Sequence, residues 1–542
     1  MSNILQKFLE WEKSIPDESF LRQPFQGKWK SYSYRKAGDE IRRIATGLKG
    51  LPARSHVALL SKNCAQWVMA DLAIMMCGHV SVPIYATLTA TSIRQILTHG
   101  DVKAIIVGKL DNYIEQRDGI PEGVLKIGIG EYGIAEEIQW EQWLNNVPLT
   151  TLYAWKPDEV FTMMYTSGTT GKYKGVMHTM AGFDLIANTG INEVGFRPRP
   201  SLFSFLPLGH AAERMGIETI GIYLGAQFSF PESLATFNDD LVKTQPHHFV
   251  AVPRLWSKIR EGVQQKMPQH KLDVLLRIPL ISSLVKSKIK KKLGLSRATQ
   301  IFSGAAPLSE ELLIWFKRLG IEIFQGYGLT ENCVSHLSKK GANKIGAVGV
   351  TASCFETKIA PDGEIRVKGK GNMVGYYKEP ELTKLAFDED GFLRTGDIGE
   401  IDKDGYLTIT GRLKDQFKTD KGKYVSPAPI EMLFTGSVAV DQVCVVGMGI
   451  PQPIALIVLS QSGRAKSKEQ VTEEFRTLLH TVNGGLDSHE KLKKAVVMKS
   501  DWSIENGLLT PTLKIKRNEI EKLKLPHYPK WYESEDIVVW ES

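Results

Sequence analysis

The sequence predicts an α/β protein: a large N-terminal domain of layered α/β subdomains with a β-rich subdomain, then a small α+β domain. Three observations support this fold class. Short apolar strands alternate with helical patterns of roughly 10–15 residues over much of the chain. Short strands separated by Asp-Gly turns follow from about residue 345. A segment with its own strands and helices begins at Gly411.

The first hundred residues carry the opening strand–helix alternation. Amphipathic patterns predict helices around Ile4–Trp11 and Ile41–Leu48. The elements predicted next are a strand at His56–Leu60, a helix at Cys64–Cys77, a strand at Val80–Ile84, a helix at Ser92–Thr98 and a strand at Ala104–Val107. This succession is typical of a layered domain with a parallel sheet.

The same alternation returns after residue 200. The predicted strands are Ser201–Leu206, His248–Val252, Thr299–Phe302 and Ile321–Phe324, and the predicted helices are Ala211–Tyr223 and Glu310–Leu319. Polar or glycine-rich turns follow three of the strands, at 206–210, 303–306 and 325–331. Ligands of open α/β sheets lie at the carboxyl ends of strands. The three turns therefore predict one shared site.

The last 200 residues divide into a region of short predicted strands and a region of predicted strands and helices. Strands at 358–359, Gly363–Val367 and Tyr406–Thr410, with turns at Asp362, Asp390 and Asp404, predict a β-rich subdomain. Strands at Gln442–Val446 and Ile454–Leu459 and helices at Glu469–Val482 and Asn518–Lys524 predict a second core. The predicted divisions are 1–410 for the large domain, with the β-rich subdomain at about 345–410, 411–415 for a hinge and 416–542 for the small domain.

Composition excludes several classes of protein. A chain that is 42% hydrophobic and 24% charged is globular and not disordered. The five cysteines contain no C-x-x-C pair, which argues against a zinc site or a disulfide framework and indicates a reducing compartment. The acidic stretch Met1–Glu18 is unlike a signal peptide, and no apolar stretch is long enough to span a bilayer. We therefore expect a cytoplasmic protein.

The net charge of +8 is concentrated in one segment. Residues 254–297 hold twelve lysines and arginines against Glu261 and Asp273, a net charge of +10. Such a segment could contact anionic lipids at the inner face of a membrane, so that the protein would be peripheral there. The alternative is a solvated helix face. Aromatic residues do not interleave with the charges, so we expect no nucleic acid partner.

A glycine-, hydroxyl- and lysine-rich stretch, Thr166–Val176, lies between the predicted strands Val160–Tyr165 and Gly175–Met177. Glycines let successive backbone N–H groups approach a ligand, and lysines add positive charge, so the stretch predicts a polyphosphate loop. It is not a Walker A loop, because two residues separate its glycines and Tyr173 follows the lysine. The alternative is a flexible hairpin tip.

Further sequence blocks follow this loop along the chain. They are Leu206–Met215, Gln325–Glu331, Gly371–Tyr377, Thr395–Asp397, Gly411–Arg412, Phe417–Glu431 and Leu509–Arg517. With these blocks in this order, the chain resembles the adenylate-forming acyl-CoA synthetase superfamily along nearly its whole length. The last two blocks look like those of the long-chain fatty acyl-CoA synthetase branch.

The resemblance implies a reaction in two steps that uses ATP, Mg²⁺ and CoA. A fatty acid would be activated to acyl-AMP with release of pyrophosphate, and the acyl group would then pass to CoA. One alternative is a ligase for another carboxylic acid, and a second is an acyl-AMP ligase that passes the acyl group to a carrier protein. A third, of another class, is an inactive nucleotide- or lipid-binding homologue.

The resemblance places the ATP phosphates and the metal ion at the loop. The residues expected around the β- and γ-phosphates are Thr166, Ser167, Gly168, Thr169, Thr170, Gly171, Lys172 and Lys174. Glu331, with Thr166, is expected to hold Mg²⁺, an ion that prefers oxygen ligands. Glu331 could instead cap the segment that follows it.

The adenosine is expected at the strand-end turns. The residues expected to form the adenine slot, where Tyr327 would stack on the base, are Gly304, Ala305, Ala306, Gly326, Tyr327, Gly328 and Thr330. Asp397 would accept hydrogen bonds from both ribose hydroxyls, with Arg412 on the same sugar or on the phosphate. For the adenine residues the alternative is a pair of ordinary β–α turns. For Asp397 the alternative is an acidic residue in a loop.

Three residues are expected near the acyl group. The resemblance places Lys514 between the acyl carboxylate and the α-phosphate, where a surface lysine is the alternative. It places His210 near the same carboxylate, where a structural histidine is the alternative. Trp256 lies where some long-chain synthetases carry an aromatic gate to the acyl tunnel, and a core tryptophan is the alternative.

Lys414 corresponds to the hinge about which members of this family rotate the small, mobile domain between half-reactions. Lys514 would then leave the site, and Lys421, Gly422 and Lys423 would enter to line a tunnel for CoA. The sequence departs from the family at Tyr173, where the phosphate loop usually has proline. The chain is also shorter than many long-chain synthetases, which leaves the depth of the acyl site open.

Overall fold

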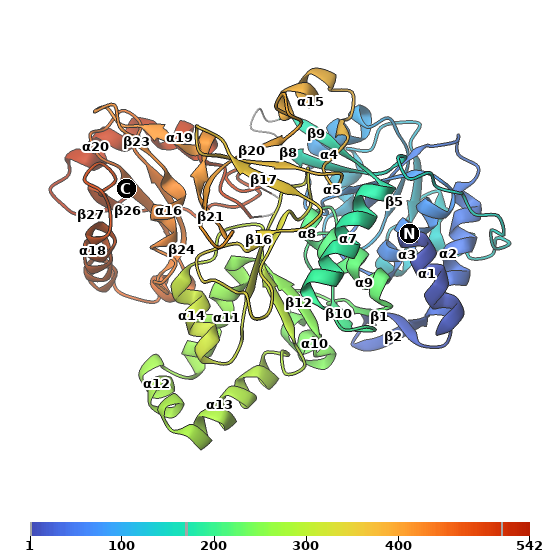
Figure 1. Cartoon of the computed structure of the whole chain (residues 1–542), viewed down its shortest axis with the longest axis horizontal. Helices are drawn as coiled ribbons and strands as arrows, with labels where there is room; N and C mark the ends of the chain where they lie inside the picture. The colour runs from blue at the N-terminus through green and yellow to red at the C-terminus, as the bar shows by residue number, and fades with distance from the viewer. Residues whose placement is uncertain (1–2, 168–171, 511–512, 542) are drawn as a thin grey trace.

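The computed structural model describes residues 3–167, 172–510 and 513–541. A large N-terminal domain is followed by a smaller C-terminal domain, drawn in orange and red in Figure 1. The described residues form two large mixed sheets, an antiparallel sheet beside them and a separate C-terminal sheet. The predicted fold class, α/β with a small α+β domain at the C-terminus, is confirmed.

The first large sheet has eight strands in the order β19-β9-β8-β4-β3-β5-β6-β7. The strands are β3 His56–Leu60, β4 Val80–Ile84, β5 Val102–Val107, β6 Leu125–Gly128, β7 Ile138–Gln139, β8 Val160–Ser167, β9 Tyr173–Thr179 and β19 Gly375–Tyr376. The strands from β8 to β7 are parallel, and β9 and β19 add an antiparallel edge. The antiparallel β8–β9 pair flanks the predicted phosphate loop, as the sequence indicated.

The second large sheet has nine strands in the order β16-β15-β14-β13-β12-β10-β11-β1-β2. The strands are β1 Ser19–Phe25, β2 Lys28–Ser33, β10 Ser201–Phe203, β11 Gln227–Ser229, β12 His248–Ala251, β13 Gln300–Ser303, β14 Phe324–Tyr327, β15 His336–Leu337 and β16 Val350–Thr351. The strands from β1 to β14 are parallel to their neighbours, and β2, β15 and β16 are antiparallel.

The large domain also contains the α-helices that precede or connect these strands. They are α1 Ile4–Ser14, α2 Tyr34–Leu48, α3 Ala65–Met76, α4 Ala90–His99, α5 Tyr113–Arg117, α6 Trp140–Trp143, α7 Met180–Val194, α8 Ala211–Glu213, α9 Ile220–Leu224, α10 Phe237–Thr244, α11 Pro253–Lys266, α12 Gln269–Arg277, α13 Pro279–Lys292, α14 Glu310–Arg318 and α15 Pro380–Ala386. Every residue of α3 is buried. Its apolar run therefore marks a core helix, and no helix among the described residues has the length and hydropathy needed to cross a bilayer.

The β-rich subdomain is an antiparallel sheet in the order β17-β18-β20-β21. Its strands are β17 Glu356–Ile359, β18 Glu364–Lys368, β20 Leu393–Ile401 and β21 Leu407–Arg412. The predicted Asp-Gly turns occur where the chain reverses, and Gly363, Gly391 and Gly405 have φ of +80°, +80° and +83°. Glycine adopts such left-handed backbone without the strain a side chain would add.

The C-terminal domain has a mixed sheet in the order β24-β25-β26-β27 and a short β22–β23 hairpin. Its elements are β22 Phe417–Lys418, β23 Tyr424–Val425, α16 Pro427–Met432, β24 Val440–Val446, β25 Ile454–Leu459, α17 Gln461–Arg464, α18 Lys468–Gly484, β26 Lys494–Val497, α19 Arg517–Lys524, α20 Tyr528–Glu533 and β27 Val538–Trp540. Two apolar clusters fill it, one on each face of the sheet.

The helix predicted at Ala211–Tyr223 is not a regular α-helix. A π-helical turn, Arg214–Thr219, separates α8 from α9. Buried Arg214 forms ion pairs with Asp71 and Glu218, each at 3.0 Å, which fixes this turn against α3. The π-turn also leaves the carbonyl of Gly216 to accept a hydrogen bond from the His248 ring at 3.0 Å. π-Turns of this kind are frequent at functional sites.

Two strands that precede the polar turns differ from their predicted bounds. The strand expected at Ser201–Leu206 ends at Phe203, and the strand expected at Ile321–Phe324 is β14 at Phe324–Tyr327. Both expectations followed apolar runs, whereas the pairing with β11 and β13 sets the observed bounds.

Candidate active site

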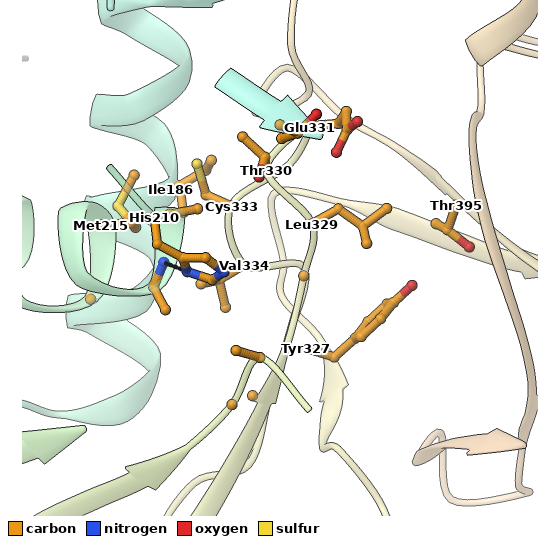
Figure 2. A pocket seen from close by; sticks show the side chains of 18 of the residues that line it. Ile186, His210, Met215, Tyr327, Leu329, Thr330, Glu331, Cys333, Val334 and Thr395 are labelled. Atoms are coloured by element: carbon orange, nitrogen blue, oxygen red, sulfur yellow. Dashed lines mark hydrogen bonds between the residues drawn. The ribbon is translucent and has the colours of Figure 1, made fainter. Parts of the chain in front are cut away.

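A cavity of about 710 Å³ lies where the two large sheets, the β-rich subdomain and the C-terminal domain meet. Its walls include His210 after β10, Gly304 after β13, Thr330 after β14 and Lys514 from the C-terminal domain. Figure 2 shows His210, Tyr327 and Glu331 around this space. The three strand-end turns that the sequence singled out therefore contribute to one cavity.

The β8–β9 hairpin reaches one wall of the cavity. Thr166, Tyr173 and Lys174 line it, and the pairing of Ser167 with Tyr173 closes the hairpin below its tip. Among the predicted phosphate contacts, Gly168, Thr169, Thr170 and Gly171 lie outside the described residues. Lys172 is exposed and is not among the residues that line the cavity.

Tyr173 occupies the position where the family usually has proline. Its hydroxyl lies 3.1 Å from Ser92 Oγ, to which it donates a hydrogen bond, and its ring lines the cavity. Its backbone is opposite Ser167 at the last pair of the β8–β9 ladder. The β8–β9 hairpin is therefore held by the Tyr173 side chain and by the strand pairing.

A tyrosine that the sequence analysis assigned no role connects the hairpin to Glu331. The Tyr376 hydroxyl donates to Glu331 Oε1 at 2.8 Å, and Lys174 Nζ lies 5.0 Å from the centroid of the Tyr376 ring. Burial and the Glu331 carboxylate both raise the pKa of Tyr376, so its hydroxyl stays protonated. This contact holds the predicted metal carboxylate beside the predicted phosphate lysine.

The residues present fit a magnesium ion bound mainly through substrate. The described residues contain no group of three or more His, Cys, Asp or Glu side chains that could hold a metal ion. Glu331 and Thr166 both line the cavity and offer oxygen donors. Mg²⁺ is commonly bound by one or two carboxylates plus phosphate oxygens and water.

The predicted adenine residues lie on neighbouring parallel strands. The pairing of β13 with β14 places Gly304 and Ala305 beside Gly326, Tyr327 and Gly328 in the cavity wall. At Gly328 a Cβ would lie 2.2 Å from the carbonyl oxygen of Cys333, so glycine is required there. Ala306 is exposed and is not among the lining residues.

The predicted ribose residues form one cluster. Asp397 and Arg412 are directly opposite each other on β20 and β21, and Arg412 Nε donates to Asp397 Oδ1 at 2.5 Å. The Tyr327 hydroxyl donates to Asp397 Oδ2 at 2.8 Å. Thr395, Gly396 and Arg412 line the cavity, while the buried carboxylate of Asp397 lies behind this wall.

Lys514 reaches the cavity from a tight turn in the C-terminal domain. Its backbone N–H donates to Thr510 Oγ1 at 3.0 Å, and its carbonyl accepts from the Thr510 N–H at 2.8 Å. Lys514 is exposed to solvent and lines the cavity together with His210, Thr395 and Arg412 of the large domain. Burial and the Arg412 charge lower the pKa of Lys514 to about 8, and the Asp397 carboxylate opposes this effect.

His210 is both a helix cap and a cavity residue. Its Nδ1 accepts a hydrogen bond from the Ala212 N–H at 3.1 Å (Figure 2). Burial and the charge of Lys514 lower the pKa of His210 to about 3, so the ring is neutral. Because Nδ1 is an acceptor, the proton of the neutral ring is on Nε2. The structural and the functional interpretation of His210 are therefore compatible.

The far part of the cavity is apolar. Its lining residues include Ile186, Gly190, Val194, Phe196, Met215, Gly216, Ile220, Val250, Phe302, Val334 and Leu337. A Cβ at Gly216 would meet nothing within 4 Å, and a Cβ at Gly190 would meet only Ile220 at 3.8 Å. These two glycines leave open space between α7 and the π-turn.

Sequence reasoning missed the contribution of α7, because the lining residues Ile186, Gly190 and Val194 are spread along a helix and form no motif. It also missed His178, whose Nε2 donates to the carbonyl of Thr330 at 2.7 Å and positions the turn before Glu331. Burial lowers the pKa of His178 to about 4, so the ring is a neutral donor.

Trp256 does not occupy the predicted gate. Its indole is fully buried and packs edge-on against Phe249 and Phe316, with ring centroids 5.7 and 5.1 Å apart. It belongs to the core cluster beneath α11 and α14 and is not among the residues that line the cavity. The structure therefore supports the core alternative for this residue.

The predicted hinge and CoA-tunnel residues lie in different places. Lys414 lines the cavity from the short 3₁₀ turn Leu413–Asp415 between the domains. Lys421, Gly422 and Lys423 form the exposed turn of the β22–β23 hairpin, outside the lining of the cavity. In this structure Lys514 is in the site and the Lys421–Lys423 turn is not.

Two family models match along this chain. Residues 8–377 match the family described as AMP-binding enzyme, and residues 414–523 match the AMP-binding enzyme C-terminal domain. Long-chain-fatty-acid–CoA ligase 5 of Rattus norvegicus is 29% identical over 94% of this chain and 85% of its own length. Long chain acyl-CoA synthetase 6, peroxisomal, of Arabidopsis thaliana is 30% identical over 92% of this chain and 80% of its own.

A solved structure shares the fold at lower identity. The A domain of a carboxylic acid reductase from Segniliparus rugosus, in complex with AMP and a co-purified carboxylic acid, superimposes with a TM-score of 0.80 at 21% identity. The match covers 98% of this chain and 94% of that domain.

The core position of Trp256 predicts a loss of stability on truncation. Trp256→Ala should lower the free energy of unfolding of the large domain by about 3–5 kcal/mol, because it leaves a cavity between Phe249 and Phe316. Urea denaturation followed by circular dichroism measures this loss, and Trp256→Phe, which keeps a ring, should lose less. Unchanged stability together with an altered preference for acyl chain length would support the gate instead.

The environment of Lys514 predicts how its amine titrates. Competitive labelling with acetic anhydride, followed by mass spectrometry of the peptide, should give a midpoint near pH 8. Arg412→Gln removes a neighbouring positive charge and should move the midpoint upward, towards the ordinary lysine value. Lys522, which is exposed on α19, serves as the internal reference. A Lys514 midpoint that coincides with that of Lys522 would contradict the arrangement.

Proposed function

This chain belongs to the AMP-binding enzyme family, and we propose that it is a long-chain fatty acid–CoA ligase that uses ATP, Mg²⁺ and CoA. The observation that carries the proposal is a single cavity in which one end meets the phosphate hairpin and the other is apolar, with Lys514 and His210 beside it. The similarity to two long-chain ligases over more than nine tenths of the chain supports this substrate class.

The first step would join the fatty acid to AMP. A carboxylate oxygen attacks the α-phosphorus of ATP, the bond from that phosphorus to the bridging oxygen breaks, and pyrophosphate leaves. Two anions must approach each other, so catalysis depends on cations and N–H donors that are already in place. Mg²⁺, held by Glu331 and Thr166, would supply charge neutralisation for the phosphates.

The chain's own donors suit this step. Lys514 would bridge the carboxylate and the α-phosphate as an ammonium group, and Arg412 would bind the sugar or the phosphate. The Nε2–H of His210 would orient the carboxylate, since its Nδ1 is engaged by Ala212. Its low pKa leaves a neutral ring that donates without carrying a charge.

The adenosine would bind in the wall formed by the ends of β13, β14 and β20. Gly304, Ala305 and Gly326 leave room for a flat base, against which the Tyr327 ring would stack. Asp397 would hold the ribose hydroxyls, and its contact with Tyr327 links base and sugar recognition. By the resemblance, Lys172 and the loop residues 168–171 would contact the β- and γ-phosphates.

In the second step the CoA thiolate would attack the acyl carbonyl carbon. The carbon–oxygen bond to AMP breaks, and AMP leaves with that electron pair. We propose that the chain divides into a large domain, 1–410, and a small domain, 416–542, that rotates about Lys414 between the steps. Rotation would withdraw Lys514 and bring the exposed Lys421–Lys423 turn to a pantetheine tunnel.

The proposal is tested by product analysis over a panel of acids. Pyrophosphate, AMP and acyl-CoA are measured with saturated acids from four to twenty carbons and with benzoate, with and without CoA. We expect the highest kcat/KM with long saturated acids and a CoA-dependent thioester product. Best rates with benzoate would favour another acid, pyrophosphate without CoA-dependent product would favour an acyl-AMP ligase, and no release with any acid would favour an inactive homologue.

The open space at Gly216 predicts a change of chain-length preference. Gly216→Leu should place its side chain in the apolar end of the cavity, so kcat/KM for a sixteen-carbon acid should fall about tenfold or more, while that for an eight-carbon acid stays within about threefold. Gly262→Leu is the matched control, since Gly262 on α11 is also unobstructed but lies outside the cavity lining. An equal loss for both acids would contradict this placement of the acyl chain.

A further inference from the structure

The helix pair α12–α13 is inserted between β12 and β13, two strands that contribute to the cavity wall through Val250 and Phe302. Figure 1 shows the pair, in light green, extending away from the sheets and from the C-terminal domain. Its inner face packs through Leu272, Ser282 and Ile289, which are buried. The outer surface of the pair combines exposed apolar side chains with positive charge.

Large apolar side chains are exposed at the junction of the two helices. Val274, Ile278, Leu280, Ile281 and Leu284 have exposed fractions of 57%, 44%, 84%, 37% and 72%. Scattered exposed apolar residues are normal, whereas a contiguous group on one protruding element marks an interaction surface. We refer to these five residues as the apolar tip.

Positive charge follows the apolar tip along α13. Residues 269–292 contain seven lysines and arginines and one acid, a net charge of +6. The acid, Asp273, forms an ion pair with Arg318 of α14, with 2.5 Å between Asp273 Oδ1 and the Arg318 guanidinium. Lys288, Lys291 and Lys292 are exposed on the same helix as Leu280 and Leu284.

The spacing puts apolar and cationic groups on one outward face. At about 100° of rotation per residue, Leu280, Leu284, Lys288 and Lys291 lie within about 80° of one another around the helix axis, so they share one side of α13. Leu280 and Lys288 are separated by about 12 Å along the axis, given a rise of roughly 1.5 Å per residue. Apolar groups of interfacial helices enter the headgroup–acyl boundary by about 5–10 Å while their lysines bind anionic headgroups.

We propose that the α12–α13 pair docks the protein on an anionic lipid bilayer, with the apolar tip inserted and the lysines of α13 at the headgroups. The sequence predicted lipid contact somewhere in residues 254–297. The proposal assigns this contact to the α12–α13 pair and the inserted part to the apolar tip. Charge complementarity favours lipid over a second copy of this chain, because two identical surfaces of net charge +6 would repel each other. The proposal is independent of the proposed function.

Vesicle sedimentation without ATP or fatty acid tests the docking. The full chain is mixed with unilamellar vesicles of phosphatidylcholine and phosphatidylglycerol at 3:1, or of phosphatidylcholine alone. We expect binding to the anionic vesicles that weakens at high salt, and little binding to the neutral ones. Binding that is equal on both vesicles, or none on either, would overturn the proposal.

Two variants separate the apolar from the cationic contribution. Leu280→Asp with Leu284→Asp should lower the partition coefficient about tenfold or more, and Lys288→Glu with Lys291→Glu and Lys292→Glu should lower it on anionic vesicles. The matched control is Ile114→Asp with Leu234→Asp, residues that are 86% and 90% exposed elsewhere on the surface, and it should bind as the wild type does. Circular dichroism and melting temperature verify that each variant is folded.

Two further outcomes would count against docking on lipid. Retention of wild-type binding by the Leu280→Asp, Leu284→Asp variant would exclude the apolar tip. A wild-type dimer that this variant dissociates, with no vesicle binding by either, would assign the tip to self-association. Because no enzymatic step enters the measurement, failure of the proposed function would leave its result unchanged.

Discussion

The contact between Asp397 and Arg412 is the constraint on which the arrangement of the cavity depends. The two residues are opposite each other on β20 and β21, and the chain leaves the large domain directly after Arg412. Tyr327 brings the end of β14 to the same carboxylate. One acid therefore joins two strands of the β-rich subdomain to the second large sheet, directly before the chain enters the C-terminal domain.

The same cluster controls the electrostatics of Lys514. Burial lowers the pKa of the lysine, the Arg412 charge lowers it further, and the Asp397 carboxylate opposes both effects. A change that breaks the pair would therefore shift the titration of Lys514. Coulombic effects of this kind are large where solvent is partly excluded, as it is between two domains.

Much of the fold could be predicted from the sequence, because local patterns specify it. The parallel strands β3, β4 and β5 are short apolar runs, and the Asp-Gly turns of the β-rich subdomain require glycine at positive φ. The N-terminal strand β1 could not be placed, since it pairs with β11 about two hundred residues away. The π-turn at Arg214–Thr219 could not be predicted either, because it accompanies an ion pair between Arg214 and Asp71 on another helix.

The candidate site was predictable where function is carried by turns at strand ends, as with Gly304, Tyr327 and Glu331. It was not predictable where a residue acts through packing between distant segments. Tyr376, His178 and Gly216 belong to this second group, because their roles depend on partners that no local spacing reveals. Trp256 is the opposite case: the resemblance suggests a gate, whereas the structure places the side chain in a core cluster.

The proposed membrane docking of the α12–α13 pair is consistent with the proposed substrate of the cavity, because a fatty acid is itself a lipid. The insertion carries the apolar tip, and the strands on either side of it carry Val250 and Phe302 of the cavity wall. A fatty acid is dilute in water and concentrated in membranes, so docking would place the enzyme where its substrate is. This link remains separate from the chemistry of the cavity itself.

The central claim is that Lys514, held in the cavity by the domain arrangement seen here, serves acyl-AMP formation alone. The most direct measurement compares the two half-reactions of Lys514→Ala with those of the surface control Lys522→Ala. The account predicts that Lys514→Ala loses acyl-AMP formation by about a hundredfold or more, while conversion of supplied acyl-AMP to acyl-CoA stays within about threefold of wild type. Equal losses in both half-reactions would contradict it.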